Sequence, residues 1–204
     1  MIGNDIVDLK LVLLEDKASN LRWLKKVFVE KEIELIQNSE SPNITLWRLW
    51  SMKESAYKVA VKKTGIRAFN PKRFETEILG PCQGQVSSIY GIFQTTYSIT
   101  EDYMHSIASD SFDKHAVSGQ KKSDIKDLSA GVRIGLVEHF QNNKPQFIDL
   151  NIVMNEEIPF LYSGADQLPF DISLSHHGDF VGWGYQKMLL GEIKKAGRSP
   201  LKKR

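Results

Sequence analysis

The sequence predicts an α+β fold, and three observations support this class. Residues 44–63 have the pattern of one long helix, which follows a polar break at 38–43 and ends at Gly65. Residues 74–108 then show three short strand-like runs separated by Gly, Pro and Gln turns. This order favours an antiparallel sheet packed under the helix. With 204 residues, the chain has room for two half-domains in one polypeptide.

The segments on either side of the long helix also have recognisable patterns. Residues 2–9 form a β-branched run that is typical of a strand. Residues 22–37 carry apolar side chains at helical spacing with charges between them, which predicts one amphipathic helix or two short ones. We expect that segment to be scaffold. Residues 109–123 are polar and mark the linker between the halves.

Composition limits the class of protein. The chain is 41% hydrophobic with a net charge of +2 and no long apolar run, so it can bury a core and needs no membrane span. Its start lacks the pattern of a signal peptide, and the single Cys82 permits no internal disulfide, so we expect a cytoplasmic location. The basic tail at 191–204 is more typical of a solvated end than of a nucleic-acid arm. The absence of a P-loop motif disfavours a nucleotide phosphotransferase of that class.

The stretch most typical of chemistry is 50–58, which reads Trp-Ser-Met-Lys-Glu-Ser-Ala-Tyr-Lys. Glu54 and Lys58 are four residues apart, so on a helix they point at one spot. A glutamate there can hold a hard cation, and a lysine can meet an anion. The alternative is an ordinary surface pair that stabilises the helix by about 0.2–0.5 kcal/mol.

A second acidic segment, Gly-Asn-Asp-Ile-Val-Asp, begins at residue 3. If Asp5 converges with Glu54, two carboxylates and water suit Mg²⁺, which usually takes one or two protein carboxylates and fills its other positions with phosphate oxygens. A lysine beside that ion then implies a phosphate ester. The alternative is a plain N-terminal strand that ends in a helix-capping Asp8.

The third segment, 170–180, is an alternating strand that ends in Ser-His-His-Gly. Hydroxyls, backbone N–H groups and a protonatable imidazole can together hold a phosphate, so Ser175 and His176 are candidates for an anion site. Zinc is disfavoured because adjacent histidines on a strand point apart and no Cys/His cluster completes four ligands. For His177 a plain polar turn is the favoured interpretation.

Together the three segments resemble the signature of 4′-phosphopantetheinyl transferases: a Gly-x-Asp-[Ile/Val] strand, a Trp-Ser-x-Lys-Glu-Ser-x-x-Lys helix, and a Ser-His strand. The helix is similar to that of the surfactin-synthetase-activating type. The order of the segments, with Ser-His last, is that of the holo-acyl-carrier-protein synthase type. Gly65-Ile66 and residues 69–74 and 93–108 resemble the family as well, so the likeness covers residues 1 to about 110.

The resemblance implies two pseudo-symmetric half-domains, each with an antiparallel sheet packed on helices. Residues 1–110 would be the metal-binding and catalytic half, 111–123 the linker, 124–190 the half that binds coenzyme A phosphate, and 191–204 a mobile basic tail. The second half would consist of a helix at 128–140, a strand near 147–153, an acidic turn and the Ser-His strand.

The resemblance also implies an activity. The protein would transfer 4′-phosphopantetheine from coenzyme A to a serine of an apo acyl or peptidyl carrier protein, as in fatty-acid, polyketide or nonribosomal peptide synthesis. Adenosine 3′,5′-bisphosphate would be released. Asp5 and Glu54 would hold Mg²⁺ on the pyrophosphate, and Ser175 and His176 would bind the 3′-phosphate. Lys58 would stabilise the developing charge, with Glu54 as a candidate general base. The alternative is a non-catalytic family member that binds coenzyme A or a carrier protein.

Four further expectations concern neighbours of these residues. Val7 stands where surfactin-type enzymes have a third acid, and a water would replace it. Asp8 is a weak candidate because strand positions of opposite parity face opposite sides. Lys53 points about 100° away from Glu54 and would stabilise the fold or touch the edge of coenzyme A. Carrier proteins are acidic, so surface lysines could help to dock them. The candidates are Lys25, Lys26, Lys62 and Lys63.

Overall fold

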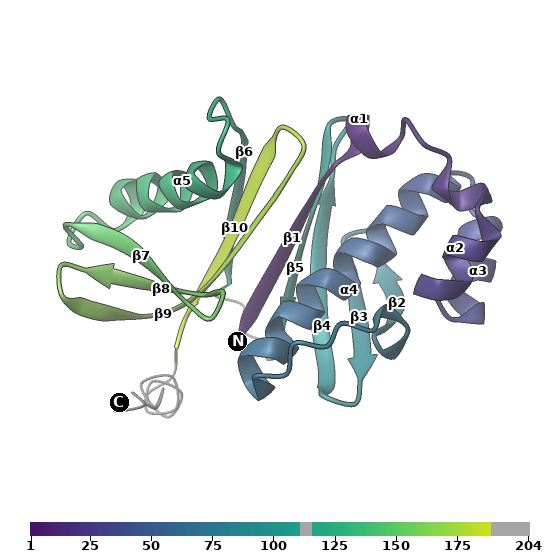
Figure 1. Cartoon of the computed structure of the whole chain (residues 1–204), viewed down its shortest axis with the longest axis horizontal. Helices are drawn as coiled ribbons and strands as arrows, with labels where there is room; N and C mark the ends of the chain where they lie inside the picture. Colours follow the sequence, from purple (N-terminus) through teal and green to yellow (C-terminus); the bar gives the residue numbers. More distant parts are fainter. Residues whose placement is uncertain (111–115, 189–204) are drawn as a thin grey trace.

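A computed structural model describes residues 1–110 and 116–188 of the chain (Figure 1). Within these ranges the fold is α+β, with two five-stranded antiparallel sheets and helices packed on them, which confirms the predicted class. The first sheet has the order β1-β5-β4-β3-β2, and the second has the order β6-β10-β9-β8-β7.

The elements of the first half are β1 (Ile2–Asp8), α1 (Leu9–Val12), η1 (Lys17–Ser19), α2 (Leu21–Val27), α3 (Glu30–Gln37), α4 (Pro42–Thr64), η2 (Pro71–Arg73), β2 (Glu75–Gly80), β3 (Gln83–Ser88), β4 (Gly91–Ile99) and β5 (Tyr103–Ser109). The second half has β6 (Val117–Lys122), α5 (Leu128–Asn143), β7 (Leu150–Asn155), β8 (Ile158–Ser163), β9 (Asp166–His177) and β10 (Phe180–Lys187).

Helix α4 is the central element of the first half. Pro42 at its first turn suits a helix start, and Gly65 ends it in the left-handed conformation with φ of 72°. The side of α4 that faces the sheet is apolar and buried, which anchors the helix on β1, β4 and β5. The predicted long helix, its end at Gly65 and the two short helices at 22–37 are therefore confirmed.

Two expectations about strands were wrong. Residues 74–108 form four strands rather than three. Residues 117–122, expected in the linker, form β6 and pair antiparallel with β10, from Lys122 opposite Phe180 to Val117 opposite Tyr185. The polar sequence of β6 lacks the alternation that identifies a strand, because β6 is an edge strand with mostly exposed or half-buried side chains. Residues 111–115 of the predicted linker and the predicted mobile tail, 191–204, lie outside the described residues.

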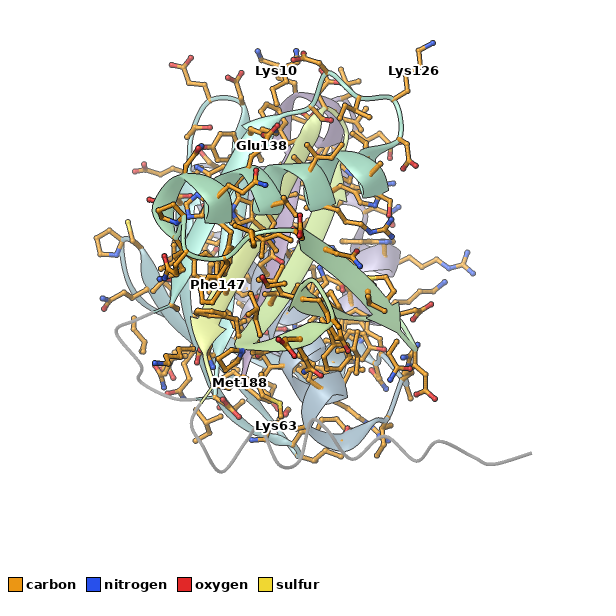
Figure 2. All side chains as sticks on the ribbon, turned by 90° about the vertical axis from the view of Figure 1, so that its left-hand side faces the viewer. Lys10, Lys63, Lys126, Glu138, Phe147 and Met188 are labelled. Atoms are coloured by element: carbon orange, nitrogen blue, oxygen red, sulfur yellow. The ribbon has the colours of Figure 1, made fainter. Side chains whose placement is uncertain are left out.

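The second half repeats the plan of one helix on one sheet. Figure 2 looks onto this half and shows α5 lying across the strands, with Glu138 on its outer side. Asp127 caps the helix by accepting a hydrogen bond from the Ala130 N–H. The strand expected near 147–153 is β7. The acidic turn, Glu156-Glu157, connects β7 to β8 and does not lead directly to the Ser-His strand, since β8 lies between them.

The two halves meet where β1 contacts β9 and β10, at the centre of Figure 1. β1 is the edge strand of its sheet, so the N–H groups on its free side need partners. Side chains on one face of β9 supply them. The bonds run from Ile2 N to Asp171 Oδ2 (2.5 Å), from Asn4 N to Ser173 Oγ (2.9 Å) and from Asp8 N to His177 Nδ1 (3.0 Å).

Lys62 of α4 forms hydrogen bonds with both halves. Its Nζ donates to Ile2 O (2.7 Å), Ile172 O (2.6 Å) and Asp171 Oδ1 (2.7 Å), and its side chain is only 8% exposed. Burial lowers the pKa of Lys62, and the charge of Asp171 opposes that change. The suggestion that Lys62 belongs to a surface for docking carrier proteins is therefore wrong.

Replacing Lys62 by Met should destabilise the protein strongly. The substitution leaves the Asp171 carboxylate buried without its cation, a change that typically costs about 3–5 kcal/mol. Urea unfolding would measure the loss, and adding Asp171→Asn to the variant should recover part of it. Lys25→Met, at an exposed lysine of α2, is the matched control, with an expected change within about 0.5 kcal/mol. Equal midpoints for Lys62→Met and the control would contradict the role given to Lys62.

Candidate functional site

Asp5 of β1 faces α4, and the structure brings it together with Glu54 and Lys58. Asp5 Oδ1 lies 3.7 Å from Lys58 Nζ, and Ser51 Oγ donates to the Asp5 carbonyl over 3.4 Å. Glu54 is near enough for the charges of Asp5 and Lys58 to influence its pKa. The helical spacing of four thus positions a carboxylate and an ammonium beside the strand carboxylate.

Gly3 makes this close approach of β1 and α4 feasible. A Cβ atom at this position would lie 2.0 Å from Ser55 O and 3.1 Å from Lys58 Cβ. Any larger residue would push the strand away from the helix. The glycine two residues before Asp5 therefore has a packing role in the site.

Both carboxylates are held in surroundings that disfavour their charged forms. Burial, and then the negative charge of Asp5, raises the pKa of Glu54 to about 7, while Lys58 opposes the change. Burial also raises the pKa of Asp5, against the opposing effects of Lys58, Ser51 and His177. A divalent cation between the two carboxylates would relieve their repulsion.

The donor set fits a magnesium ion better than a structural metal. Nowhere in residues 1–110 and 116–188 do three or more His, Cys, Asp or Glu side chains gather as a metal cluster. Two carboxylates, Asp5 and Glu54, match the protein ligands of an Mg²⁺ ion that completes its shell with water and substrate phosphate. A structural zinc site would need four protein ligands.

Lys58 touches both halves of the molecule. Its Nζ donates to Asn4 O of β1 (2.6 Å) and to Leu174 O of β9 (3.4 Å), and 29% of its side chain remains exposed. These bonds fix the ammonium beside Asp5. The same side chain lines a cavity of about 280 Å³, whose wall comes from α4, the segment after it, the β7–β8 hairpin and β9. The lining residues are Tyr57, Lys58, Val61, Lys62, Arg67, Met154, Glu156, Glu157, Ile158, Pro159, Ser173 and Leu174.

Lys53 stabilises the fold. It is fully buried, and its Nζ donates to Glu32 Oε2 (2.8 Å), Pro71 O (3.0 Å) and Phe74 O (2.5 Å). The other oxygen of Glu32 accepts from both the N–H and the hydroxyl of Thr76 (2.7 and 2.6 Å). All three ammonium hydrogens have partners, so contact with a ligand is the less suitable of the two roles expected for Lys53.

Val7 and Asp8 also have structural roles. Val7 is 3% exposed and belongs to an apolar cluster with Leu9 and Met104, which accounts for an apolar residue at that position. Asp8 caps α1: its Oδ1 accepts from Leu11 N (3.1 Å) and its Oδ2 from Asp179 N (3.0 Å). The helix-capping interpretation of Asp8 is confirmed.

The Ser-His pair does not form one cradle. Ser175 is 6% exposed, and its Oγ accepts from Asn4 Nδ2 (2.6 Å) and donates to Gly182 O (3.3 Å). His176, the next residue along the strand, is exposed. Successive strand residues face opposite sides, so the side chains of Ser175 and His176 point away from each other in this structure. Phosphate binding by Ser175 and His176 remains a prediction.

Sequence reasoning missed two histidines near the site. His177 was assigned to a plain polar turn, but its Nδ1 accepts the Asp8 N–H, and it lies near enough to Asp5 to oppose the rise in the pKa of Asp5 that burial causes. His105, on β5, is buried with its Nε2 3.1 Å from Asn4 Nδ2. Burial lowers the pKa of His105 to about 4, so the neutral ring accepts from the Asn4 amide. The alternation of β1, with Asp5 toward α4 and Asn4 toward the second half, could have indicated a polar contact there.

Comparison with known proteins identifies the family of this chain. The sequence model of one family, the 4′-phosphopantetheinyl transferase superfamily, matches residues 1–117, which is more than half of the chain. The protein therefore belongs to this superfamily, whose activity is phosphopantetheinyl transfer and whose substrate is coenzyme A. The match includes Asp5, Glu54 and Lys58 and ends before Ser175. No curated protein matches the sequence.

No helix in residues 1–110 or 116–188 combines the length and apolar character needed to cross a membrane.

Lys53→Met should lower the free energy of unfolding by about 3–5 kcal/mol, because Glu32 would remain buried without its cation. Chemical denaturation of the variant would measure this. The double variant Lys53→Met with Glu32→Gln should recover part of the loss, since the amide leaves no buried charge. If Lys53→Met unfolds at the denaturant concentration of the unchanged protein, the buried ion pair has no such role.

Stability should depend on pH through His105. Its pKa in the folded protein, about 4, lies below the ordinary 6.5, so between these values the unfolded chain binds a proton that the folded chain does not. The contribution is complete above pH 6.5 and is lost as the pH falls toward 4. It amounts to about 3 kcal/mol. Urea unfolding over this range should show a shallower dependence for His105→Gln, and identical slopes would contradict the assignment.

Proposed function

We propose that this protein transfers 4′-phosphopantetheine from coenzyme A to a serine of an apo acyl or peptidyl carrier protein in an Mg²⁺-dependent reaction. The observation that carries the proposal is the convergence of Asp5, Glu54 and Lys58 beside a cavity between the halves of a superfamily member. Adenosine 3′,5′-bisphosphate is the second product. A cytoplasmic location stays a prediction.

Asp5 and Glu54 would hold the magnesium ion. When bound, such an ion polarises phosphate oxygens and neutralises the charge that develops on them during transfer. The raised pKa values of both carboxylates support this assignment, because a cation would relieve the repulsion and desolvation that raise them. Val7 contributes no ligand atom from its side chain.

Lys58 would stabilise the negative charge on the transferred phosphoryl group. Its ammonium is held by carbonyl oxygens of both halves, so little reorganisation is needed when that charge develops. A donor positioned in advance contributes more than one that must be ordered during the reaction. We therefore expect the loss of Lys58 to lower the turnover rate more than it lowers the affinity for coenzyme A.

Glu54 would take the proton of the carrier serine, directly or through a water. The serine oxygen forms a bond to the phosphorus on the pantetheine side as the bond from that phosphorus to the bridging pyrophosphate oxygen breaks. The electron pair leaves with adenosine 3′,5′-bisphosphate. The position of Glu54 beside Asp5 and Lys58 supports this second role, since a carboxylate held next to the reacting groups is a common general base.

Coenzyme A would occupy the cavity that Lys58 lines, with its pyrophosphate at the Asp5 end. Ser175 would act mainly by holding Asn4, the neighbour of Asp5, through their 2.6 Å hydrogen bond. Among the proposed carrier-docking lysines, Lys25 and Lys26 of α2 and Lys63 of α4 are exposed. They remain candidates for the acidic partner.

Intact-mass spectrometry of an apo carrier protein incubated with this protein, coenzyme A and Mg²⁺ tests the proposal. One added phosphopantetheine group, roughly 340 Da, is expected, and a chelator should abolish the gain. Glu54→Ala and Lys58→Met should each slow transfer by about 100-fold or more, because each removes a group that acts on the reacting atoms.

Glu34→Gln, which removes an exposed carboxylate from α3, is the matched control and should leave transfer unchanged. Coenzyme A binding without any mass gain across several carrier proteins would favour the non-catalytic alternative. Full activity of Glu54→Ala would remove Glu54 from the proposed chemistry.

A further inference from the structure

Asn4 is a buried polar residue at a strand position whose neighbours are apolar. It is fully buried, and so are Ile2 and Ile6, which lie on the same face of β1. A buried amide lowers stability unless all its hydrogen-bonding atoms have partners. Among the described residues, Asn4 Oδ1 has no hydrogen-bond partner. Stability alone therefore does not account for an asparagine at this position.

The other polar atoms of Asn4 connect β1 to its surroundings on both sides. The side-chain Nδ2 donates to Ser175 Oγ of β9 (2.6 Å) and lies 3.1 Å from His105 Nε2 of β5. The backbone N–H donates to Ser173 Oγ of β9 (2.9 Å). These bonds fix Asn4 against its own sheet and against the second half at the same time.

The backbone oxygen of Asn4 holds the Lys58 ammonium. Lys58 Nζ donates to Asn4 O over 2.6 Å, which is shorter than its distances to Leu174 O (3.4 Å) and to Asp5 Oδ1 (3.7 Å). A short hydrogen bond from a charged donor is stronger than a long one. The place of the ammonium therefore depends mainly on where Asn4 lies.

His105 supports the Asn4 amide and is itself held by both halves. Burial lowers the pKa of His105 to about 4, so the neutral ring can accept from Asn4. Gly182 of β10 lies against the ring, because a Cβ atom there would be 3.0 Å from His105 Nε2. Gln120 of β6 also interacts with His105 and donates to the Tyr103 hydroxyl (2.8 Å). The partner of the Asn4 amide is therefore fixed in place.

We propose that Asn4 is a positioning residue for the transfer reaction, which sets the place of the Lys58 ammonium. Its bonds to His105 and Ser175 fix the amide and, with it, the carbonyl that Lys58 meets. Asn4 acts through Lys58 and not by contact with the substrate. The inference rests on the proposed function, since it assumes that Lys58 stabilises the charge on the transferred phosphoryl group.

Steady-state kinetics of carrier-protein modification by Asn4→Leu test the proposal. Leucine has nearly the shape of asparagine but makes no hydrogen bonds, so turnover should fall by about tenfold, as expected for a small displacement of a reacting group. The KM for coenzyme A should change by less than about twofold. The melting temperature should change by less than about 5 °C, because removal of the unpartnered Oδ1 offsets the lost bonds. Asn151→Leu, at an exposed position of β7, is the matched control and should behave as the unchanged protein.

A double-mutant cycle identifies the residue through which Asn4 acts. In a Lys58→Met background, Asn4→Leu should cause less than about twofold further loss of turnover, because the ammonium that it positions is gone. Losses that multiply in the double variant would overturn the proposal. Unchanged turnover in Asn4→Leu would overturn it as well.

A pair of His105 variants keeps the test valid if Asn4→Leu folds poorly. The amide oxygen of His105→Gln can still accept from Asn4, whereas His105→Leu offers no acceptor. His105→Gln should therefore keep at least about threefold more turnover than His105→Leu, with the same KM for coenzyme A. Equal turnover of the two variants would contradict the proposal.

A spectroscopic measurement separates this inference from the function on which it rests. The NMR signal of Lys58, labelled at Cε, should shift in Asn4→Leu and stay in place in Asn151→Leu. If the unchanged protein modifies a carrier protein and Asn4→Leu alters neither turnover nor this signal, only the role of Asn4 fails. If the unchanged protein modifies no carrier protein, the proposed function fails, and the role of Asn4 in transfer fails with it.

Discussion

The free edge of β1 is the constraint on which the rest of the structure depends. An edge strand with unpaired N–H groups cannot be buried between two halves without hydrogen-bond partners. Asp171, Ser173 and His177 of β9 supply them, and the lysines of α4 bond carbonyl oxygens of the same strand. The junction of the halves is therefore polar and directional.

Successive residues of β1 also face different parts of the molecule and have different roles. Asp5 faces α4, where Glu54 and Lys58 complete the candidate site, while Asn4 faces the second half and its buried polar groups. The carboxylate is thus carried by a strand that is fixed from both sides. Such support keeps two carboxylates close although burial raises the pKa of each.

Sequence reasoning succeeded where a pattern has one physical cause. The spacing of four on a long helix predicted that Glu54 and Lys58 share a face, and Gly65 marked the helix end. It failed where the partner is distant in sequence. Lys62 appeared to be a surface lysine because its buried partner Asp171 is more than one hundred residues away. The polar strand β6 lacks alternation, and pairing with β10 defines it.

The hydrogen bonds from β9 to β1 have a consequence for how the chain must be handled. A fragment that ends at residue 110 would keep the family signature but expose the edge of β1 with its donors unpaired. Exposed edges of this kind invite strand-to-strand association between molecules. Expression of the first half alone should therefore yield aggregates or edge-paired dimers, because the strand that covers this edge belongs to the half outside the family match.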